Sequence, residues 1–255
     1  MNDIPQHTGS GGDTPVSIVG RPELEAALQA FGPLLDNMIL VGGHVPPLLV
    51  TDPGAPRPRP TGDVDVVARV STTTGYAQLE AQLRELGFTH YTADTPPVIC
   101  RWLTPGSPNE RVIVDVIPPS GVPFGFTNRW YGHAIESAHA VTISPKLTVC
   151  VIAPPVFLAT KWEAFNDRGH QDWYQSHDFE DIVAVIAGRR TLVAEVGTAA
   201  AAAVREFVAR ECRKLCNRTD VDDIISGAVP DRYEVGESVQ RVLTTFRDLA
   251  HLINP

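Results

Sequence analysis

Aspartate and valine alternate in residues 61 to 66, which read Thr-Gly-Asp-Val-Asp-Val. Successive residues of a β-strand point to opposite faces of its sheet, so Asp63 and Asp65 share one face and the two valines share the other. The valines predict a face packed on a core, and the aspartates predict a face that opens into a polar cleft. Two neighbouring carboxylates need a counterion, and a hard, oxygen-preferring cation such as Mg²⁺ suits them.

A third aspartate lies within another β-branched run, because residues 111 to 117 read Arg-Val-Ile-Val-Asp-Val-Ile. A carboxylate in mid-strand, such as Asp115, carries a desolvation cost of several kcal/mol unless it is paired or bound to a metal. Three carboxylates from two adjacent strands suit two divalent ions, which assist phosphoryl or nucleotidyl transfer in other sites of this kind. We therefore expect Asp63, Asp65 and Asp115 to bind Mg²⁺ or Mn²⁺ and to act in catalysis.

Each aspartate also has a structural interpretation. In that interpretation Asp63 is a turn residue, Asp65 pairs with Arg69 or Arg101, and Asp115 forms a buried salt bridge. The order of features along the chain favours catalysis. A strand, a Gly-Gly turn, an apolar segment and a loop precede the Asp-x-Asp strand, and a later strand carries an aspartate of its own.

The first half of the chain predicts alternating helices and strands. From Pro22, the apolar residues Leu24, Leu28 and Phe31 recur at helical spacing. A strand over residues 38 to 41 then ends at the Gly42-Gly43 turn, where glycine interrupts the apolar pattern. Further on, we expect a short helix within 44–50, a loop over 52–60, a strand over 64–70, an amphipathic helix over 76–86 closed by Gly87, and a strand over 111–117.

Beyond Pro154-Pro155 the pattern becomes helical. We expect helices over 155–168 and 178–187, an alanine-rich helix over 192–215, and two more before Pro255. The predicted fold class is therefore α+β: a mixed-sheet domain with helices at 17–150 and an α-helical domain at 151–255 that completes the active-site cleft. Residues 1–16 are polar and rich in Gly and Pro, and we expect them to be disordered.

Composition narrows the classes of function. A hydrophobic content of 43% supports an ordinary globular core, while a net charge of -9 argues against a broad basic surface for duplex DNA. The four cysteines form no Cys-x-x-Cys pair, and we interpret them as reduced thiols. Neither a signal segment nor an apolar run of ~20 residues is present, so we expect a cytoplasmic protein with no membrane partner.

This order of motifs resembles the polymerase-beta-like nucleotidyltransferase superfamily, in which a Gly-Gly or Gly-Ser turn precedes Asp-x-Asp and a third-strand carboxylate. The resemblance covers about residues 36 to 119. It implies that Gly42 and Gly43 bind the nucleotide by bringing their backbone amides close to its phosphates. It also implies that Asp63 and Asp65 bind both metal ions and that Asp115 binds the catalytic one.

The chain departs from that family pattern after the glycines. His44 stands where the family usually has Ser or another small residue, and Pro46-Pro47 follow it. The loop before the Asp-x-Asp strand is also long, and it contains Arg57 and Arg59. We interpret His44 as a residue at the start of a helix.

A second group of charged residues lies between positions 161 and 181. Lys161 and Arg168 are seven residues apart, so they share one helix face. We expect both to bind the phosphates of a nucleoside triphosphate. The segment is similar to the Lys-x-x-Ala-x-x-x-Arg and Asp-x-x-Asp patterns of the abortive-infection (AbiEii-type) branch of the superfamily, which includes toxins of toxin–antitoxin pairs. That resemblance implies that Lys161 contacts the phosphates and that Asp178 completes the catalytic site, with Asp181 as the other candidate.

This segment also has a simpler interpretation. Long cationic side chains often lie along a helix surface with their charged ends in water, and Ser or Asp often caps a helix. Lys161 and Arg168 would then be surface residues, and Ser176 or Asp178 would cap the following helix.

These features predict a metal-dependent nucleotidyltransferase that binds an NTP between its two domains. It would transfer NMP to an acceptor, either an RNA end, a protein or a small molecule, and release pyrophosphate. The resemblance makes the chain a candidate toxin and an antitoxin protein a candidate partner. The alternative is a catalytically inactive relative of the fold that binds a nucleotide or a protein.

Overall fold

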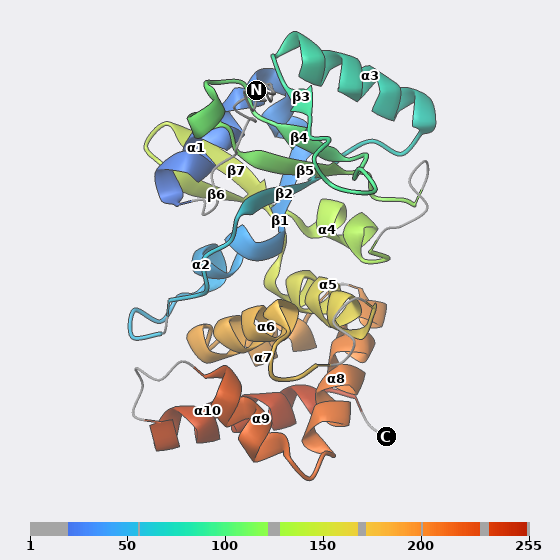
Figure 1. Cartoon of the computed structure of the whole chain (residues 1–255). Coiled ribbons are helices and arrows are strands. Elements are labelled where there is room, and N and C mark those ends of the chain that lie inside the picture. Colours follow the sequence, from blue (N-terminus) through green and yellow to red (C-terminus); the bar gives the residue numbers. More distant parts are fainter. Residues whose placement is uncertain are drawn as a thin grey trace, which may run out of the picture.

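The computed structural model describes residues 20–55, 57–121, 128–167, 172–199, 201–229 and 235–253. The segment 1–16, expected to be disordered, lies outside these residues. A mixed seven-stranded sheet occupies the first half of the chain, and helices α5 to α10 follow it (Figure 1). The α+β fold class is therefore confirmed.

The strand that carries Asp63 and Asp65 lies in the interior of the sheet. The strand order is β3-β4-β5-β2-β1-β7-β6. β2 pairs in parallel with β5 and antiparallel with β1, and β7 pairs in parallel with the other side of β1. The strands are β1 (Met38–Val41), β2 (Asp63–Ala68), β3 (Thr89–His90), β4 (Arg101–Leu103), β5 (Ile113–Ile117), β6 (His139–Ser144) and β7 (Leu147–Val151).

The predicted alternation along β2 is confirmed. Val64 and Val66 are fully buried, whereas the side chains of Asp63 and Asp65 are partly exposed. In β5, Val114 and Val116 are both 0% exposed, and Asp115 between them is buried as well. The burial of these β-branched side chains stabilises the sheet and fixes which face the aspartates occupy.

Helices border the sheet in the first half of the chain. α3 lies on the side of the sheet away from the helical region (Figure 1), and the Tyr76 hydroxyl on it donates to the Val116 carbonyl at 2.8 Å. Thr72 caps α3 by accepting from the Gly75 amide, and Gly87 follows the helix at a φ of 87°. The α-helices of this half are α1 (Arg21–Ala30), α2 (Pro46–Leu49), α3 (Thr73–Glu85) and α4 (Tyr131–Ser137).

The second half is helical, as expected, but one boundary prediction is wrong. The single helix expected over 192–215 is two helices, because α7 ends at Gly197 and α8 begins at Ala202. Glycine weakens a helix, and the Thr198 hydroxyl donates to the Ala194 carbonyl at 2.9 Å, which satisfies an acceptor at the helix end. The helices are α5 (Pro154–Asp167), α6 (His177–Gly188), α7 (Leu192–Gly197), α8 (Ala202–Cys216), α9 (Val221–Ala228) and α10 (Val235–Ala250).

The end of α6 packs against the loop that connects α2 to β2. The amides of Thr51 and Asp52 both donate to the Gly188 carbonyl at 2.9 Å, and Arg189 Nη1 donates to the Leu49 carbonyl at 2.7 Å. These bonds attach the helical region to the segment leading into β2. The division of the chain into domains at residue 150 stays a prediction.

Two further expectations concern the described residues. Among the helices of this part of the chain, none combines the length and apolar character that crossing a membrane requires. The four cysteines are free thiols, as the sequence predicts.

Candidate active site

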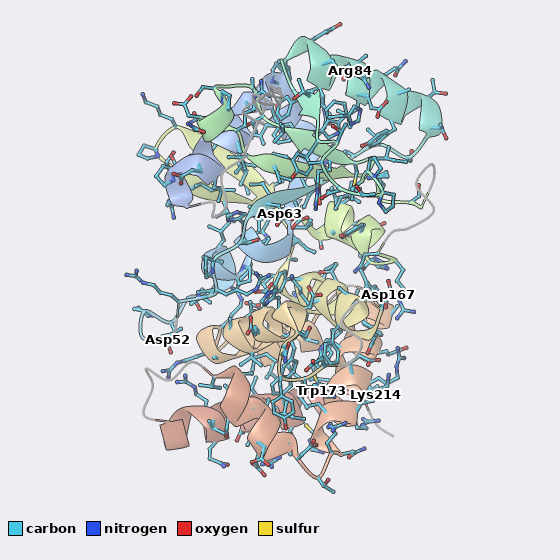
Figure 2. The ribbon with its side chains drawn as sticks, in the orientation of Figure 1. Asp52, Asp63, Arg84, Asp167, Trp173 and Lys214 are labelled. Atoms are coloured by element: carbon cyan, nitrogen blue, oxygen red, sulfur yellow. The ribbon has the colours of Figure 1, made fainter. Side chains whose placement is uncertain are left out.

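The three predicted aspartates meet on one face of the sheet. β2 and β5 are parallel with Asp65 directly beside Asp115, so the two side chains project in the same direction, and Asp63 lies two residues before Asp65 on that face. One carboxylate oxygen from each of the three lies within 4.8 Å of the others. Asp63 lies at the end of the sheet that faces the helical region (Figure 2). Three convergent carboxylates are a donor set that fits a hard divalent cation.

The Gly42-Gly43 turn lies directly against this acidic cluster. Gly42 has a φ of 70°, and a Cβ atom there would fall 1.9 Å from Asp65 Oδ2. A Cβ on Gly43 would lie 2.9 Å from Thr61 Oγ1, which itself donates to Asp63 Oδ1 at 3.2 Å. Only residues without a side chain allow the backbone to approach the aspartates so closely.

Arg101 contacts the acidic cluster from the neighbouring strand β4. It lies opposite Asp115 in the antiparallel β4–β5 pair. Its Nε donates to Asp115 Oδ1 at 2.8 Å and its Nη2 donates to Asp115 Oδ2 at 2.7 Å, a bidentate geometry. Nη2 also lies 3.4 Å from Asp63 Oδ2, and Nη1 donates to Asp94 at 3.0 Å. The structural interpretation of Asp115 as part of a salt bridge is thus confirmed.

Burial and charge act in opposite directions on the Asp115–Arg101 pair. Burial raises the pKa of the Asp115 carboxyl, and the hydrogen bonds and charge of Arg101 counteract that effect. The hydrogen bonds to Asp115 raise the pKa of the Arg101 guanidinium, which stays protonated. A permanent cation therefore lies among the aspartates.

His44 lies beside the glycine turn as a buried, neutral side chain. It ends a short 3-10 turn over Gly42–His44 that leads directly into α2, which agrees with its interpretation as a helix-start residue. Burial lowers its pKa to about 4, the charge of Asp63 opposes this shift, and the charge of Arg59 adds to it. Within the described part of the chain, its Nε2 atom is buried without a hydrogen-bond partner.

Lys161 and Asp178 form a second cluster in the helical region. Lys161 Nζ on α5 lies 2.9 Å from Asp178 Oδ1 and 2.7 Å from Asp181 Oδ2, both on α6. Asp178 and Asp181 are three residues apart, so they share the face of α6 that meets α5. Although burial lowers the pKa of Lys161, the charges of Asp181 and Asp178 outweigh it and raise the pKa overall.

Burial distinguishes the two interpretations of this segment. Lys161 is 5% exposed, so the interpretation of this lysine as a surface cation is wrong. The cap assigned to Ser176 is confirmed, because its hydroxyl accepts from the Phe179 amide. Arg168, the other predicted phosphate ligand, lies outside the described residues.

Arg59 links the two clusters. Its guanidinium lies 3.2 Å from Asp181 Oδ1, so Asp181 has cations on two sides. Arg59 is four residues before Asp63, and four residues span at most about 14 Å of extended chain. The structure thus joins the Lys161 cluster to the start of β2 through one short segment.

The sequence reasoning missed the importance of Arg59, Asp94 and Arg101. Arg101 was considered only as a partner of Asp65, and its bidentate contact with Asp115 depends on the register of the β4–β5 pair. Arg59 lies in a Pro-rich loop with no periodic pattern. The one available signal was that Asp115 in mid-strand required a cation.

No protein-family model matches the chain, and no curated protein matches its sequence. The structural finding is an α+β fold whose mixed β-sheet carries a partly buried acidic triad of Asp63, Asp65 and Asp115. A glycine turn packs closely against this triad.

Proposed function

We propose that this chain is a divalent-metal-dependent nucleotidyltransferase of the polymerase-beta-like type. The observation that carries the proposal is the convergence of Asp63, Asp65 and Asp115 beside a turn whose backbone packs on Asp65. Carboxylates supply the ligands that Mg²⁺ and Mn²⁺ prefer, and backbone amides of a glycine turn suit phosphate oxygens. The two features together suit a nucleoside triphosphate with its metal.

The three aspartates would hold the metal, and the metal would lower the pKa of an attacking hydroxyl and neutralise charge on the triphosphate. The amides of Gly42 and Gly43 would orient the phosphates. An acceptor hydroxyl would lose its proton to solvent, and its oxygen would then form a bond to the α-phosphorus. The bond from that phosphorus to its bridging oxygen would break, and pyrophosphate would leave.

Lys161 would contact the triphosphate from the helical region. A lysine ammonium has three N–H donors, and Asp178 and Asp181 engage two of them. The third donor would bind a phosphate oxygen, while the two carboxylates hold the ammonium in position. Asp178 would act in this way as a positioning residue, and Asp181 would share that role because it lies closer to Nζ.

The Lys161–Asp178 motif favours the abortive-infection branch of the superfamily. On that basis we extend the proposal to a toxin of a toxin–antitoxin pair, with an RNA end, a protein or a small molecule as acceptor. Expression in a bacterial host tests this extension. Growth arrest with the wild-type chain and normal growth with Asp65→Ala would support it, whereas equal growth with both would contradict it.

The activity is tested with purified protein, Mg²⁺ and each α-labelled NTP, with total RNA, protein and small-molecule pools as acceptors. Label should enter one pool with the wild type and fall at least about 100-fold with Asp63→Asn or Asp65→Asn, since each removes a metal ligand. Asp36→Asn, at an exposed position before β1, is the matched control and should retain activity. Equal labelling by wild type and Asp63→Asn would refute the assignment.

A second candidate is a relative that binds nucleotide without catalysis. The observation that favours it is the bidentate contact between Arg101 and Asp115, which neutralises part of the acidic cluster without a metal. Calorimetry separates the candidates. NTP binding that is indifferent to Mg²⁺, with no labelled product, would support the second one.

A further inference from the structure

Arg101 lies beside the acidic cluster and supplies a positive charge to it. Its two donors to Asp115 engage both oxygens of that carboxylate, and Nη2 also lies 3.4 Å from Asp63 Oδ2. The side chain comes from β4, directly across from Asp115, so the strand register directs it at the triad. The pairing of β4 with β5 thus fixes the position of the guanidinium.

A guanidinium and a divalent ion would use the same oxygens. Mg²⁺ binds carboxylate oxygens at about 2.0–2.1 Å and requires near-octahedral geometry, which leaves little freedom to share a carboxylate with two short N–H donors. Two cations on one carboxylate also repel each other, and repulsion is strong where burial reduces the screening by water. Asp115 is only 7% exposed, so this condition is met.

Arg101 also has a second partner that lies nearer to solvent. Its Nη1 donates to Asp94 at 3.0 Å, and the side chains of Arg101 and Asp94 are 22% and 33% exposed. Asp94 would therefore retain the guanidinium after Asp115 released it. Asp94 is not one of the three proposed metal ligands, so Arg101 can keep this contact with or without a bound metal.

We propose that Arg101 is an internal counter-cation that competes with divalent metal for Asp115 and Asp63, and that metal binding displaces it toward Asp94. This inference rests on the proposed metal site and adds a residue that sets the metal affinity of that site. Arg101 neutralises the buried carboxylate of Asp115 while metal is absent, so the sheet would fold without metal. The metal concentration needed to fill the site is then higher than the three aspartates alone would require.

The experiment is a Mn²⁺ titration of the full-length protein followed by electron paramagnetic resonance of free Mn²⁺. Arg101→Gln should bind Mn²⁺ at least about tenfold more tightly than the wild type, because the competing charge is gone. Arg101→Lys should lie between them, since a lysine keeps the charge but cannot engage Asp115 through a planar fork. Arg84→Gln removes a charge from the surface of α3 and is the matched control.

Thermal unfolding of the same variants gives a second measurement. Without metal, Arg101→Gln should unfold at a lower temperature than the wild type, because Asp115 loses its partner. Saturating Mn²⁺ should raise its midpoint by more than that of the wild type. If Arg101→Gln does not fold, Arg101→Lys still tests the inference through its Mn²⁺ affinity.

The outcomes separate this inference from the proposed function. Equal or weaker Mn²⁺ binding by the folded Arg101 variants, with clear binding by the wild type, would overturn the competition and leave the metal site intact. Absence of Mn²⁺ binding in both the wild type and folded Arg101→Gln would overturn both. Loss of Mn²⁺ binding in Asp115→Asn should accompany a positive result, since it ties the measured site to the triad.

Discussion

Gly42 and Asp65 pack so closely that any side chain on Gly42 would displace the carboxylate. A Cβ atom there would fall 1.9 Å from Asp65 Oδ2 and 2.8 Å from Asp65 Cβ, and the φ of 70° is unfavourable for other residues. The turn and the acidic strand therefore depend on each other for their geometry.

Gly42→Ala should lower both the stability and the Mn²⁺ affinity of the protein. We expect a loss of about 1–3 kcal/mol in the free energy of unfolding, from backbone strain and overpacking. Urea unfolding and a Mn²⁺ titration measure the two effects. The control is Gly132→Ala in α4, where a Cβ would meet nothing within 4 Å. If Gly42→Ala behaves like this control, the close approach described for the turn is wrong.

Lys161→Met should strongly destabilise the helical region. The substitution removes the cation shared by Asp178 and Asp181, and breaking a buried ion pair costs about 3–5 kcal/mol. Chemical denaturation measures the change, with the exposed Lys146→Met as the control. The double variant Lys161→Met/Asp178→Asn should recover part of the loss, because one unpaired charge disappears with it. A loss in Lys161→Met no larger than in the control would contradict the buried cluster.

His44 should make the free energy of unfolding depend on pH below neutrality. Its folded pKa of about 4 lies below the unfolded value of 6.5, so the unfolded chain binds the proton more readily. The stabilisation from the neutral form is complete above pH 6.5 and is lost as the pH falls toward 4, by about 3 kcal/mol in total. His44→Gln should flatten this part of the pH profile relative to wild type. The exposed His251→Gln is the control, and parallel profiles for wild type and His44→Gln would refute the prediction.

Gly188→Ala should weaken the packing between α6 and the loop before β2. A Cβ there would lie 2.7 Å from both methyl carbons of Val50 and 3.0 Å from Ala55 Cβ. We expect a loss of about 1–3 kcal/mol in the free energy of unfolding from overpacking. Gly227→Ala in α9 is the control, because its nearest neighbour would lie at an ordinary 3.6 Å. Equal shifts of the calorimetric unfolding midpoint in both variants would show that the loop accommodates the added Cβ without a loss of stability.

Local patterns predicted several of the longer elements but not β6 and β7, although these strands have six and five residues. The strand β1 has the predicted bounds, and β2 shows the predicted alternation of buried valine and partly exposed aspartate. The helices α3, α5 and α6 also agree with their predicted ranges to within a few residues. In contrast, β3 and β4 have only two and three residues, too few to establish an alternation.

The sequence predicted those parts of the site that follow from side chains sharing one face of a strand. Alternation placed Asp63 and Asp65 together, and the buried run around Asp115 required a partner for its charge. The identity of that partner depends on the β4–β5 register, which pairs Arg101 with Asp115 through long-range contacts that no local pattern encodes. Arg59 reaches Asp181 from a loop 122 residues away in sequence, which is likewise a property of the fold.

The place of β1 in the sheet has a consequence for synthesis of the chain. All three aspartates have been synthesised by Ile117, but β1 gains its neighbour β7 only after Leu147, about thirty residues later. During that interval one edge of β1 is an open row of amide and carbonyl groups, which readily pairs with strands of other chains. A folding intermediate in which β5, β2 and β1 have paired before β7 docks would therefore expose an edge prone to aggregation, although its three aspartates are already together.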